Sequence, residues 1–373
     1  MTDNVLIIGG GGRIGRSVAA DLLSHTSAEV TLTGRRSAPR FALSARQRYR
    51  PLNLSDSGDL QAAIAAHQLV IHCGGPFRSR GLEVLTHCID ARTNYVDVAD
   101  SPDYVAQALA LGPAAQAAGV TAVVSTGVFP GISNSMVRQG IEELDRAESV
   151  HLSYLVAGSG GAGVTVMRTT FIELQTAFQA RVNGRWQLIW PYSEPEVLSF
   201  PAPYDCGASV YWFNTVEAYT LARSFPQLAS VVTKFGSLPD YYNRLTALMT
   251  RLPSGWLQQS AVVELLAQIS YAMTQVTDRY SGTGIAMRLA IQGQLGDGAA
   301  TYLATTTHPD TAAAAGFGTG SVAQLLLSGE LRQPGVWPVE QALTTRQFKA
   351  AMASRGLTIH QDLKRFENPR PGA

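Results

Sequence analysis

Lysine, cysteine and charge of either sign are scarce in this sequence. Only Lys234, Lys349 and Lys364 occur among 373 residues, so the first 233 positions cannot supply the lysine of a Schiff base or of a P-loop. Three cysteines are too few for a disulfide framework and fit a reducing, cytoplasmic compartment. Charged residues make up 15% of the chain and hydrophobic residues 46%. We therefore expect a large buried fraction, an apolar pocket or an oligomer interface.

Signals for membrane or nucleic-acid partners are also missing. The formal net charge of +1 provides no basic field for nucleic acid, and the N-terminus lacks the basic segment of a signal peptide. A stretch of 34 uncharged residues separates Asp103 from Arg138, but glycine, proline and polar residues interrupt it. We interpret it as buried helix, strand and loop and expect no integral membrane span. The expected partner is a small-molecule substrate.

A run of glycines follows the first apolar segment. Residues 4–8 predict a strand buried on both faces, and residues 9–12 are all glycine. A helical pattern then continues to His25, before a second strand at residues 29–33. This order is typical of dinucleotide-binding turns, whose glycines allow a tight bend and close approach of a diphosphate to the helix N-terminus. The registers Gly9, Gly12, Gly15 and Gly10, Gly12, Gly15 both fit, and Arg13 and Ile14 open the helix.

The end of the second strand indicates which nicotinamide cofactor is bound. An acidic residue about 20 positions after the last glycine would bind the ribose hydroxyl of NAD. That count ends on Arg35, with Arg36 beside it. A guanidinium group forms bidentate, charge-assisted bonds with a phosphate, so the pair predicts binding of the 2′-phosphate of NADP(H). The alternative is a pair of solvated loop arginines.

More buried strands alternate with helical stretches along the first third of the chain. We expect them at residues 48–54, 69–72, 95–98 and 122–124, which predicts an α/β fold with a Rossmann-type, doubly wound parallel sheet. Ligands of such sheets bind beyond the carboxyl ends of the strands. The loops at residues 73–77, 97–100 and 126–131 should therefore surround one crevice. Its candidate catalytic residues are Asp97 and Asp100. His72 is a further candidate, although a buried histidine is more often a satisfied core residue.

Several catalytic motifs are absent. No Tyr-x-x-x-Lys pair exists, which excludes the proton donor of short-chain dehydrogenases, and there is no Gly-x-Ser-x-Gly or His-Glu-x-x-His motif. The pairs His72-Cys73 and His87-Cys88 look like metal ligands. Neighbouring residues on a strand point to opposite faces, so each such pair offers one ligand at most. We therefore expect no metal site.

The pattern changes after about residue 150. Hairpins are expected at Asn183-Gly184 and at residues 287–306, which predicts an α+β domain with a mixed or antiparallel sheet. A strand at 151–156, glycines at 158–163 and a helix at 164–179 form a second strand–glycine–helix passage, interpreted as a substrate-facing loop. Residues 186–219 are rich in aromatic side chains, which suits a pocket, a dimer surface or plain core. Residues 228–276 are apolar and expected to be helical, as a lid, an oligomer contact or a lipid-facing surface.

Five motifs in this order resemble the saccharopine dehydrogenase-like family of NADP-binding oxidoreductases. They are VLIIGGGGRIG at residues 5–15, CGGPF at 73–77, NYVDVAD at 94–100, GVFPG at 127–131 and GVWPVE at 335–340. Similar proteins form or reduce secondary amines that join an amine to a keto acid or an aldehyde. The resemblance also implies that the end of the chain returns to the first domain, with a helix at residues 348–357. It thus predicts an NADP-binding domain at 1–131, completed by 336–373, and a substrate and oligomerisation domain at 132–335.

The resemblance assigns further residues to the site. Gly74, Gly75, Pro76 and Phe77 should flank the nicotinamide ribose, while Phe77, Phe129 and Gly131 should face the substrate. Saccharopine carries several carboxylates, which need paired cations. The aromatic content of the second domain suggests a less polar substrate. The arginines of this domain form no cluster in the sequence; they are Arg168, Arg185, Arg223, Arg244 and Arg288.

The leading hypothesis is an NADP(H)-dependent oxidoreductase, expected as a homodimer, that moves a hydride to or from a carbon bonded to nitrogen or oxygen. Asp97 or Asp100 would relay a proton or bind a substrate amine. The alternative is a non-catalytic NADP-binding regulator that senses redox state through a protein partner. A third possibility, a lipid-associated reductase, is suggested by the apolar region at residues 228–276.

Overall fold

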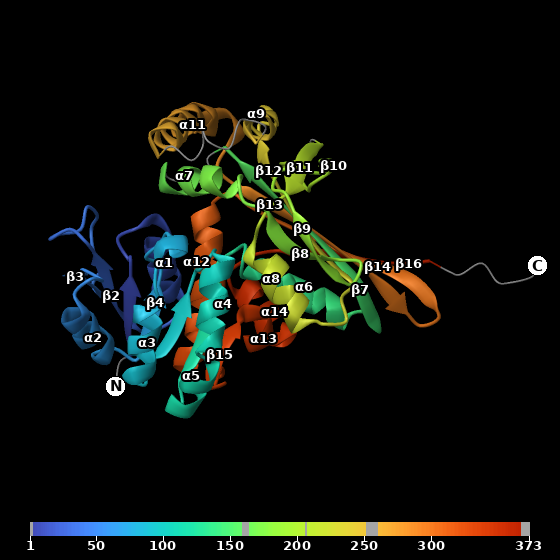
Figure 1. The fold of residues 1–373 in the computed structure, drawn as a ribbon. Helices are drawn as coiled ribbons and strands as arrows, with labels where there is room; N and C mark the ends of the chain where they lie inside the picture. Colours follow the sequence, from blue (N-terminus) through green and yellow to red (C-terminus); the bar gives the residue numbers. More distant parts are fainter. Residues whose placement is uncertain (1–2, 159–163, 206, 251–259, 367–373) are drawn as a thin grey trace, which may run out of the picture. The chain divides into compact units, whose positions relative to one another are not determined.

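The computed structural model describes residues 3–158, 164–205, 207–250 and 260–366. Two units make up the chain (Figure 1). The first combines Met1–Ser135 with Ala312–Gly356, and the second combines Met136–Thr311 with Leu357–Ala373. Each unit is built around its own seven-stranded sheet.

All strand pairs in the first sheet are parallel, in the order β15-β6-β5-β4-β1-β2-β3. This is the expected doubly wound sheet, extended at one edge by β15 from the C-terminal region. The elements of this unit are β1 (Asn4–Ile8), α1 (Arg13–His25), β2 (Glu29–Gly34), β3 (Gln47–Pro51), α2 (Ser57–Ala65), β4 (Leu69–His72), the 3-10 helix η1 (Phe77–Ser79), α3 (Glu83–Asp90), β5 (Asn94–Asp97), α4 (Pro102–Ala110), α5 (Gly112–Ala118), β6 (Thr121–Val124), α12 (Thr311–Ser328), β15 (Gly335–Pro338), α13 (Val339–Ala342) and α14 (Thr345–Ser354).

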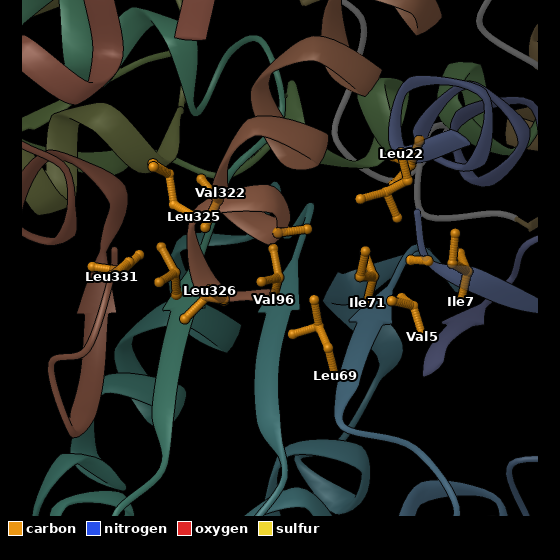
Figure 2. Close-up of a cluster of buried hydrophobic side chains, with 14 of the residues drawn as sticks. Val5, Ile7, Leu22, Leu69, Ile71, Val96, Val322, Leu325, Leu326 and Leu331 are labelled. Atoms are coloured by element: carbon orange, nitrogen blue, oxygen red, sulfur yellow. The ribbon is translucent and has the colours of Figure 1, made fainter. Parts of the chain in front are cut away.

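The core of the first unit explains why its strands are apolar throughout. Every second residue of the central strands points to one face of the sheet, where the side chains meet those of α1 and α12. Figure 2 shows this layer, with Leu22 on α1 and Val322, Leu325 and Leu326 on α12. The intervening strand residues, such as Leu6 and Ile8, are buried on the other face. Strands covered on both faces read as continuous hydrophobic runs.

Helix α12 fits closely because of its glycines. A Cβ atom on Gly316 would lie 2.8 Å from the carbonyl oxygen of Ser17 on α1, and one on Gly318 would lie 2.1 Å from the carbonyl oxygen of Gly127. A Cβ atom on Gly320 would lie 2.0 Å from the carboxylate of Asp21. The backbone contacts of Gly316 and Gly318 leave no room for a side chain, so α12 can lie against both α1 and the loop after β6.

The second unit has a mixed sheet, as expected, in the order β10-β11-β12-β7-β13-β14-β16. Only β12 and β7 pair in parallel, and the other neighbours are antiparallel. The predicted hairpins are present as β8–β9 and β13–β14. The elements are α6 (Ile132–Glu142), β7 (Arg146–Ala157), α7 (Val164–Glu173), β8 (Phe178–Val182), β9 (Arg185–Ile189), β10 (Glu196–Leu198), β11 (Ala208–Trp212), α8 (Val216–Ser224), β12 (Ser230–Leu238), α9 (Tyr241–Met249), α11 (Ser260–Ser281), β13 (Ile285–Leu295), β14 (Gly298–His308) and β16 (His360–Phe366).

Two expectations about the second unit's elements are wrong. The region 228–276 is not helical throughout, because Ser230–Leu238 forms β12 between β11 and β7. The helix expected to reach residue 179 ends at Glu173, and Phe178 starts β8. Strand β12 pairs in parallel with β7, which is distant in sequence, and no local pattern reveals that pairing. Strand β8 forms the first arm of the hairpin with β9. Most of the glycine passage at 158–163 lies outside the described residues.

The division between the units differs from the expected boundaries of 1–131 with 336–373 and 132–335. The return to the first unit begins at Ala312 rather than at 336, because α12 packs on the first sheet. The last strand leaves that unit again, because β16 pairs with β14 of the second sheet. The expected returning helix at 348–357 corresponds to α14, Thr345–Ser354.

Candidate functional site

The glycine turn between β1 and α1 has backbone geometry that only glycine tolerates. Gly9 has a φ of +76°, and a Cβ atom on it would lie 2.9 Å from the carbonyl carbon and oxygen of Cys73. A Cβ atom on Gly15 would lie 2.5 Å from the carbonyl oxygen of Gly9. Gly12 caps α1 and donates its N–H to that same oxygen at 2.9 Å. The tight-turn role therefore belongs to Gly9, in register with Gly12 and Gly15.

The end of β2 holds this turn in place. The hydroxyl oxygen of Thr33 accepts the N–H of Gly9 at 3.3 Å, and the hydroxyl donates to the carbonyl of Ile7. The carbonyl of Thr33 accepts the N–H of Gly11 at 3.1 Å. Beyond these bonds lies the first turn of α1, where the backbone N–H groups of Ile14 and Gly15 have no acceptor within the helix.

A pocket of about 530 Å³ opens beside this turn. No acidic residue is among those lining it, which are Gly9, Gly11, Gly12, Thr33, Gly34, Arg35, Arg36, Ala38, Pro39, Arg40, Phe41 and Tyr49. The hydroxyl of Tyr49 donates to the carbonyl of Arg36 at 3.0 Å and so holds the backbone directly after the two predicted arginines. Arg35, Arg36 and Arg40 are exposed, and none forms an ion pair with a carboxylate in the described part of the chain. The pocket thus offers three uncompensated cations to an anion.

Sequence reasoning found Arg35 and Arg36 but missed Arg40, Phe41 and Tyr49. Arg40 and Phe41 lie in an irregular loop, where no periodic pattern predicts which side chains turn back toward the glycine turn. Tyr49 lies on β3, which pairs in parallel with β2 and so places the ring beside Gly34. Its place beside β2 could have suggested a pocket residue.

Buried polar side chains occupy the carboxyl ends of β4 and β5. The carboxylate of Asp97 accepts the N–H groups of Ser125 at 2.7 Å and Ala99 at 3.0 Å, and the hydroxyl of Tyr95 at 3.0 Å. Asp97 has no exposed surface, and burial raises its pKa to about 6, against the opposing effect of these hydrogen bonds. Asp97 therefore holds together the loops after β5 and β6.

His72 and Phe77 extend this buried group. The Nδ1 atom of His72 lies 3.2 Å from the hydroxyl oxygen of Tyr95, and burial lowers the pKa of His72 to about 3, so the ring is neutral near pH 7. Phe77 packs edge-on against His72 at 4.9 Å and against Tyr104 at 5.0 Å between ring centroids. Its side chain is thus buried inside the first unit.

The predicted loop Gly74, Gly75, Pro76 and Phe77 lies next to the glycine turn. The close approach of Gly9 to Cys73 and Gly74 brings the two segments into direct contact. The Nε atom of Arg80 donates to the carbonyl of Gly74 at 2.8 Å and closes the loop from its far side. The structure therefore brings together the two segments to which cofactor binding was assigned.

The loop after β6 depends on glycine and on the C-terminal motif. Gly131 has a φ of +133°, and a Cβ atom on it would lie 2.1 Å from the carbonyl oxygen of Gly127. The amide of Asn134 accepts the N–H of Gly131 and donates to buried Glu340, both at 3.0 Å. Phe129 in this loop is half-buried. The motif at residues 335–340 thus supports the predicted substrate loop.

Asp97 and Asp100 lie on the same loop in different surroundings. Asp100 is exposed, although partial desolvation by neighbouring atoms raises its pKa. Asp97 is enclosed and has all its described contacts within the first unit. Of the two predicted carboxyl groups, only Asp100 has a side chain that a molecule in solution can reach.

The described ranges contain neither a cluster of metal ligands nor a helix that could cross a membrane. Within them, no three histidine, cysteine, aspartate or glutamate side chains form a ligand cluster for a metal ion. No helix among the described residues combines the length and the hydropathy needed to cross a bilayer.

A parallel sheet with this strand order, a glycine turn before α1 and an arginine-lined pocket after β2 define a dinucleotide-binding Rossmann domain. Residues 5–123 match the model of the saccharopine dehydrogenase NADP binding domain. The chain thus carries the NADP-binding domain of the saccharopine dehydrogenase-like family. The resemblance and the cofactor NADP(H), both expected from the sequence, are confirmed, and the domain is of the oxidoreductase class.

Three solved structures share the fold over nearly the whole chain. Saccharopine dehydrogenase (L-Glu forming) from Saccharomyces cerevisiae is 14% identical with a TM-score of 0.67, covering 97% of this chain and 100% of that one. The C. glutamicum DAP dehydrogenase in complex with DAP is 14% identical with a TM-score of 0.53, covering 95% and 99%. An engineered D-amino acid dehydrogenase bound to NADP+ is 15% identical with a TM-score of 0.51, also covering 95% and 99%. At these identities the similarity shows the fold alone.

The raised pKa of Asp97 leads to a pH-dependent prediction. Folded Asp97 holds its proton up to about pH 6, whereas the ordinary value is 3.8. The contribution of that proton to the free energy of unfolding is fully present below about pH 4 and is lost as the pH rises through about 6. Two pKa units correspond to roughly 2–3 kcal/mol. The neutral amide of Asp97→Asn removes this dependence. We therefore expect the variant's free energy of unfolding, relative to the natural chain, to rise by about that amount between pH 4 and pH 8.

Urea unfolding at a series of pH values measures this difference. Asp103→Asn, at an exposed position on α4, is the matched control and should follow the natural chain. Parallel stability profiles for Asp97→Asn and the natural chain would contradict the prediction.

Proposed function

We propose that this protein is an NADP(H)-dependent oxidoreductase that transfers a hydride to or from a carbon bonded to nitrogen, as in an imine or secondary amine, or to oxygen. The observation that carries the proposal is the pocket beside the glycine turn, which has three unpaired arginines and no carboxylate. The match to a saccharopine dehydrogenase NADP binding domain and the shared fold of two amino-acid-related dehydrogenases support it.

The first unit's residues fit this cofactor in distinct ways. Gly9 and Gly12 have no side chains, which leaves room for a diphosphate against the start of α1. The N–H groups and the dipole at this helix end favour an anion. Arg35 and Arg36 would bind the 2′-phosphate. The loop from Gly74 to Phe77, in contact with the glycine turn, would flank the nicotinamide ribose. The bound cofactor supplies the hydride chemistry, and the protein orients it.

The carboxyl groups after β5 would act at different points. Asp97 positions the backbone of Ser125 and Ala99, and its burial removes it from direct contact with a substrate in this arrangement. Exposed Asp100 is better placed to bind a substrate amine or to relay a proton. Half-buried Phe129 and the bend at Gly131 would form the apolar side of the substrate site.

The second unit's arginines support a substrate with few carboxylates. Arg168 is paired with Glu264, and Arg244 with Asp240. The guanidinium of Arg223 lies over the ring of Tyr219, 3.6 Å from its centroid. These three of the five arginines already have partners, which leaves few cations for a substrate as acidic as saccharopine.

Binding and turnover are tested separately. Titration with NADPH, followed by its fluorescence, should show saturable binding that is tighter than for NADH. Purified protein with NADPH should then oxidise it when given an amine together with a keto acid or aldehyde, or a preformed cyclic imine. Absence of binding at millimolar NADPH would refute the proposal. Binding without oxidation throughout such a screen would favour the NADP-binding regulator instead.

A further inference from the structure

One ring nitrogen of His72 lacks a partner, although the side chain has no exposed surface. The Nδ1 atom lies 3.2 Å from the hydroxyl oxygen of Tyr95, whereas the Nε2 atom has no hydrogen-bond partner among the described residues. Buried polar atoms without a partner are rare in folded proteins. One at the carboxyl end of a strand in a Rossmann sheet is a candidate for exchange with a bound molecule.

The unpaired nitrogen lies next to the loop assigned to the cofactor. His72 is the last residue of β4, and this loop begins two residues later with Gly74. A Cβ atom on Gly74 would lie 3.2 Å from Nε2 of His72 and 3.3 Å from the side chain of Ile8 on β1. The same loop contacts the glycine turn at Gly9. The Nε2 atom is therefore on the side of His72 that faces the expected nicotinamide ribose.

The hydroxyl of Tyr95 connects the opposite nitrogen of His72 to Asp97. Its oxygen lies 3.0 Å from Oδ2 of Asp97, 3.2 Å from Nδ1 of His72 and 2.9 Å from the hydroxyl oxygen of Tyr104. The other carboxylate oxygen, Oδ1, already accepts two backbone N–H groups. A proton on Asp97 therefore belongs on Oδ2, where it points at Tyr95.

The hydrogens of this network can be assigned while Asp97 is ionised. Tyr95 donates its single proton to Asp97, and Tyr104 donates its own proton to Tyr95. His72 can then bond to Tyr95 only as a donor, through a proton on Nδ1. Because burial lowers the pKa of His72 to about 3, the ring holds no second proton near pH 7. The Nε2 atom is then a bare acceptor.

A proton on Asp97 reverses this arrangement. Asp97 then donates through Oδ2 to Tyr95, which is the only partner of that oxygen. Tyr95 turns its proton to Nδ1 of His72, because donation to Tyr104 would leave the proton of Tyr104 without an acceptor in the described chain. The single proton of the neutral ring is then on Nε2. The state of Asp97 thus decides whether Nε2 accepts or donates.

We propose that Asp97, Tyr95 and His72 form a proton relay that ends at Nε2, beside the loop for the nicotinamide ribose. A proton that binds to Nε2 displaces the Nδ1 proton onto Tyr95, and Tyr95 releases its own proton to Oδ2 of Asp97. The ring stays neutral and the gained proton is stored on Asp97; the reverse sequence delivers it.

The use of this relay rests on the proposed function. When a hydride reduces the carbon of an imine, the nitrogen must gain a proton, and oxidation of the amine releases one. Asp97 can hold that proton without touching the substrate, whereas direct contact remains with exposed Asp100.

The groups around the relay leave Asp97 as its titrating member. The titratable neighbours are Cys73, Arg80, Glu83, Cys88, Asp100 and Tyr104. Burial raises the pKa of both thiols and of this tyrosine, so they stay neutral near pH 7. Together with burial, the arginine disfavours a positive charge on His72, and Asp100 disfavours a negative charge on Asp97. The relay therefore changes state near pH 6, where Asp97 titrates.

NMR of the full chain with isotope-labelled histidine tests the relay, because it identifies which ring nitrogen carries the proton. His72→Gln assigns the signal among the seven histidines. In the natural chain the proton should move from Nδ1 to Nε2 as the pH falls through about 6. Tyr95→Phe and Asp97→Asn should each hold one tautomer throughout. Tyr104→Phe is the matched control and should retain the change, because the three relay residues stay connected.

Addition of NADPH tests where the relay ends. Saturating NADPH should shift the Nε2 signal of His72 and leave that of His25, at the far end of α1, unchanged. A tautomer that ignores pH in the natural chain, or that still changes in both Tyr95→Phe and Asp97→Asn, overturns the relay. A His72 signal that bound NADPH does not move overturns its placement beside the cofactor. Failure to bind NADPH refutes the proposed function but leaves the pH-dependent tautomer to be observed, so the two proposals fail separately.

Discussion

Arg35→Asp is expected to remove the preference for NADP(H) over NAD(H). The arginine lies in a pocket without a carboxylate, next to the glycine turn. Its replacement removes a charge-assisted contact to the 2′-phosphate and introduces a repelling charge, at a cost of about 3 kcal/mol. The dissociation constant for NADPH should therefore rise about 100-fold. NADH should bind as well as before or better, because its ribose hydroxyls can donate hydrogen bonds to an aspartate.

Fluorescence titration with both cofactors measures the change. Arg48→Asp is the control, because Arg48 on β3 carries the same charge but pairs with Glu29 at 3.2 Å and does not line the pocket. It should leave the cofactor preference intact. If Arg35→Asp weakened the binding of NADPH and of NADH equally, the fold would be damaged. An unchanged preference for NADPH over NADH would show that Arg35 does not bind the 2′-phosphate.

The cofactor half of the site is predictable because local sequence dictates it. A left-handed turn at Gly9 and close packing at Gly15 require glycine, so the motif records the backbone geometry directly. The arginines come at a fixed distance along the same strand–helix–strand unit. The parallel sheet could be expected for a similar reason, because strands covered on both faces show as short apolar runs.

The remaining parts depend on contacts between distant segments. Nothing local marks α12 as a partner of α1, because the required close approach shows only as scattered glycines in an alanine-rich helix. The enclosure of Asp97 likewise depends on Ser125, Tyr95 and the loop between them, which the sequence does not bring together. Strand β12 lies in a region whose hydrophobicity suits helix and strand equally, and only its pairing with β7 decides between them.

The pair Asp21 and Arg355 joins the C-terminal return to the helix that starts at the glycine turn. The Nε of Arg355 donates to Asp21 at 2.9 Å and a terminal nitrogen donates at 2.6 Å, and both side chains are almost fully buried. Arg355 also donates to Gln324 of α12 at 3.1 Å. Arg355→Met leaves the Asp21 carboxylate buried without its cation. We expect a loss of about 3–5 kcal/mol in the free energy of unfolding.

A double-mutant cycle separates the ion pair from the packing. Asp21→Ala combined with Arg355→Met should cost no more than Arg355→Met alone, because the buried charge has gone as well. Urea unfolding measures stability, and NADPH titration at low temperature measures the effect on the site. Since Asp21 lies on α1, loss of Arg355 should also weaken NADPH binding by loosening that helix, whereas Arg346→Met, at an exposed position of α14, should change neither quantity. Full additivity of the two substitutions would show that Arg355 stabilises the unit by packing rather than through Asp21.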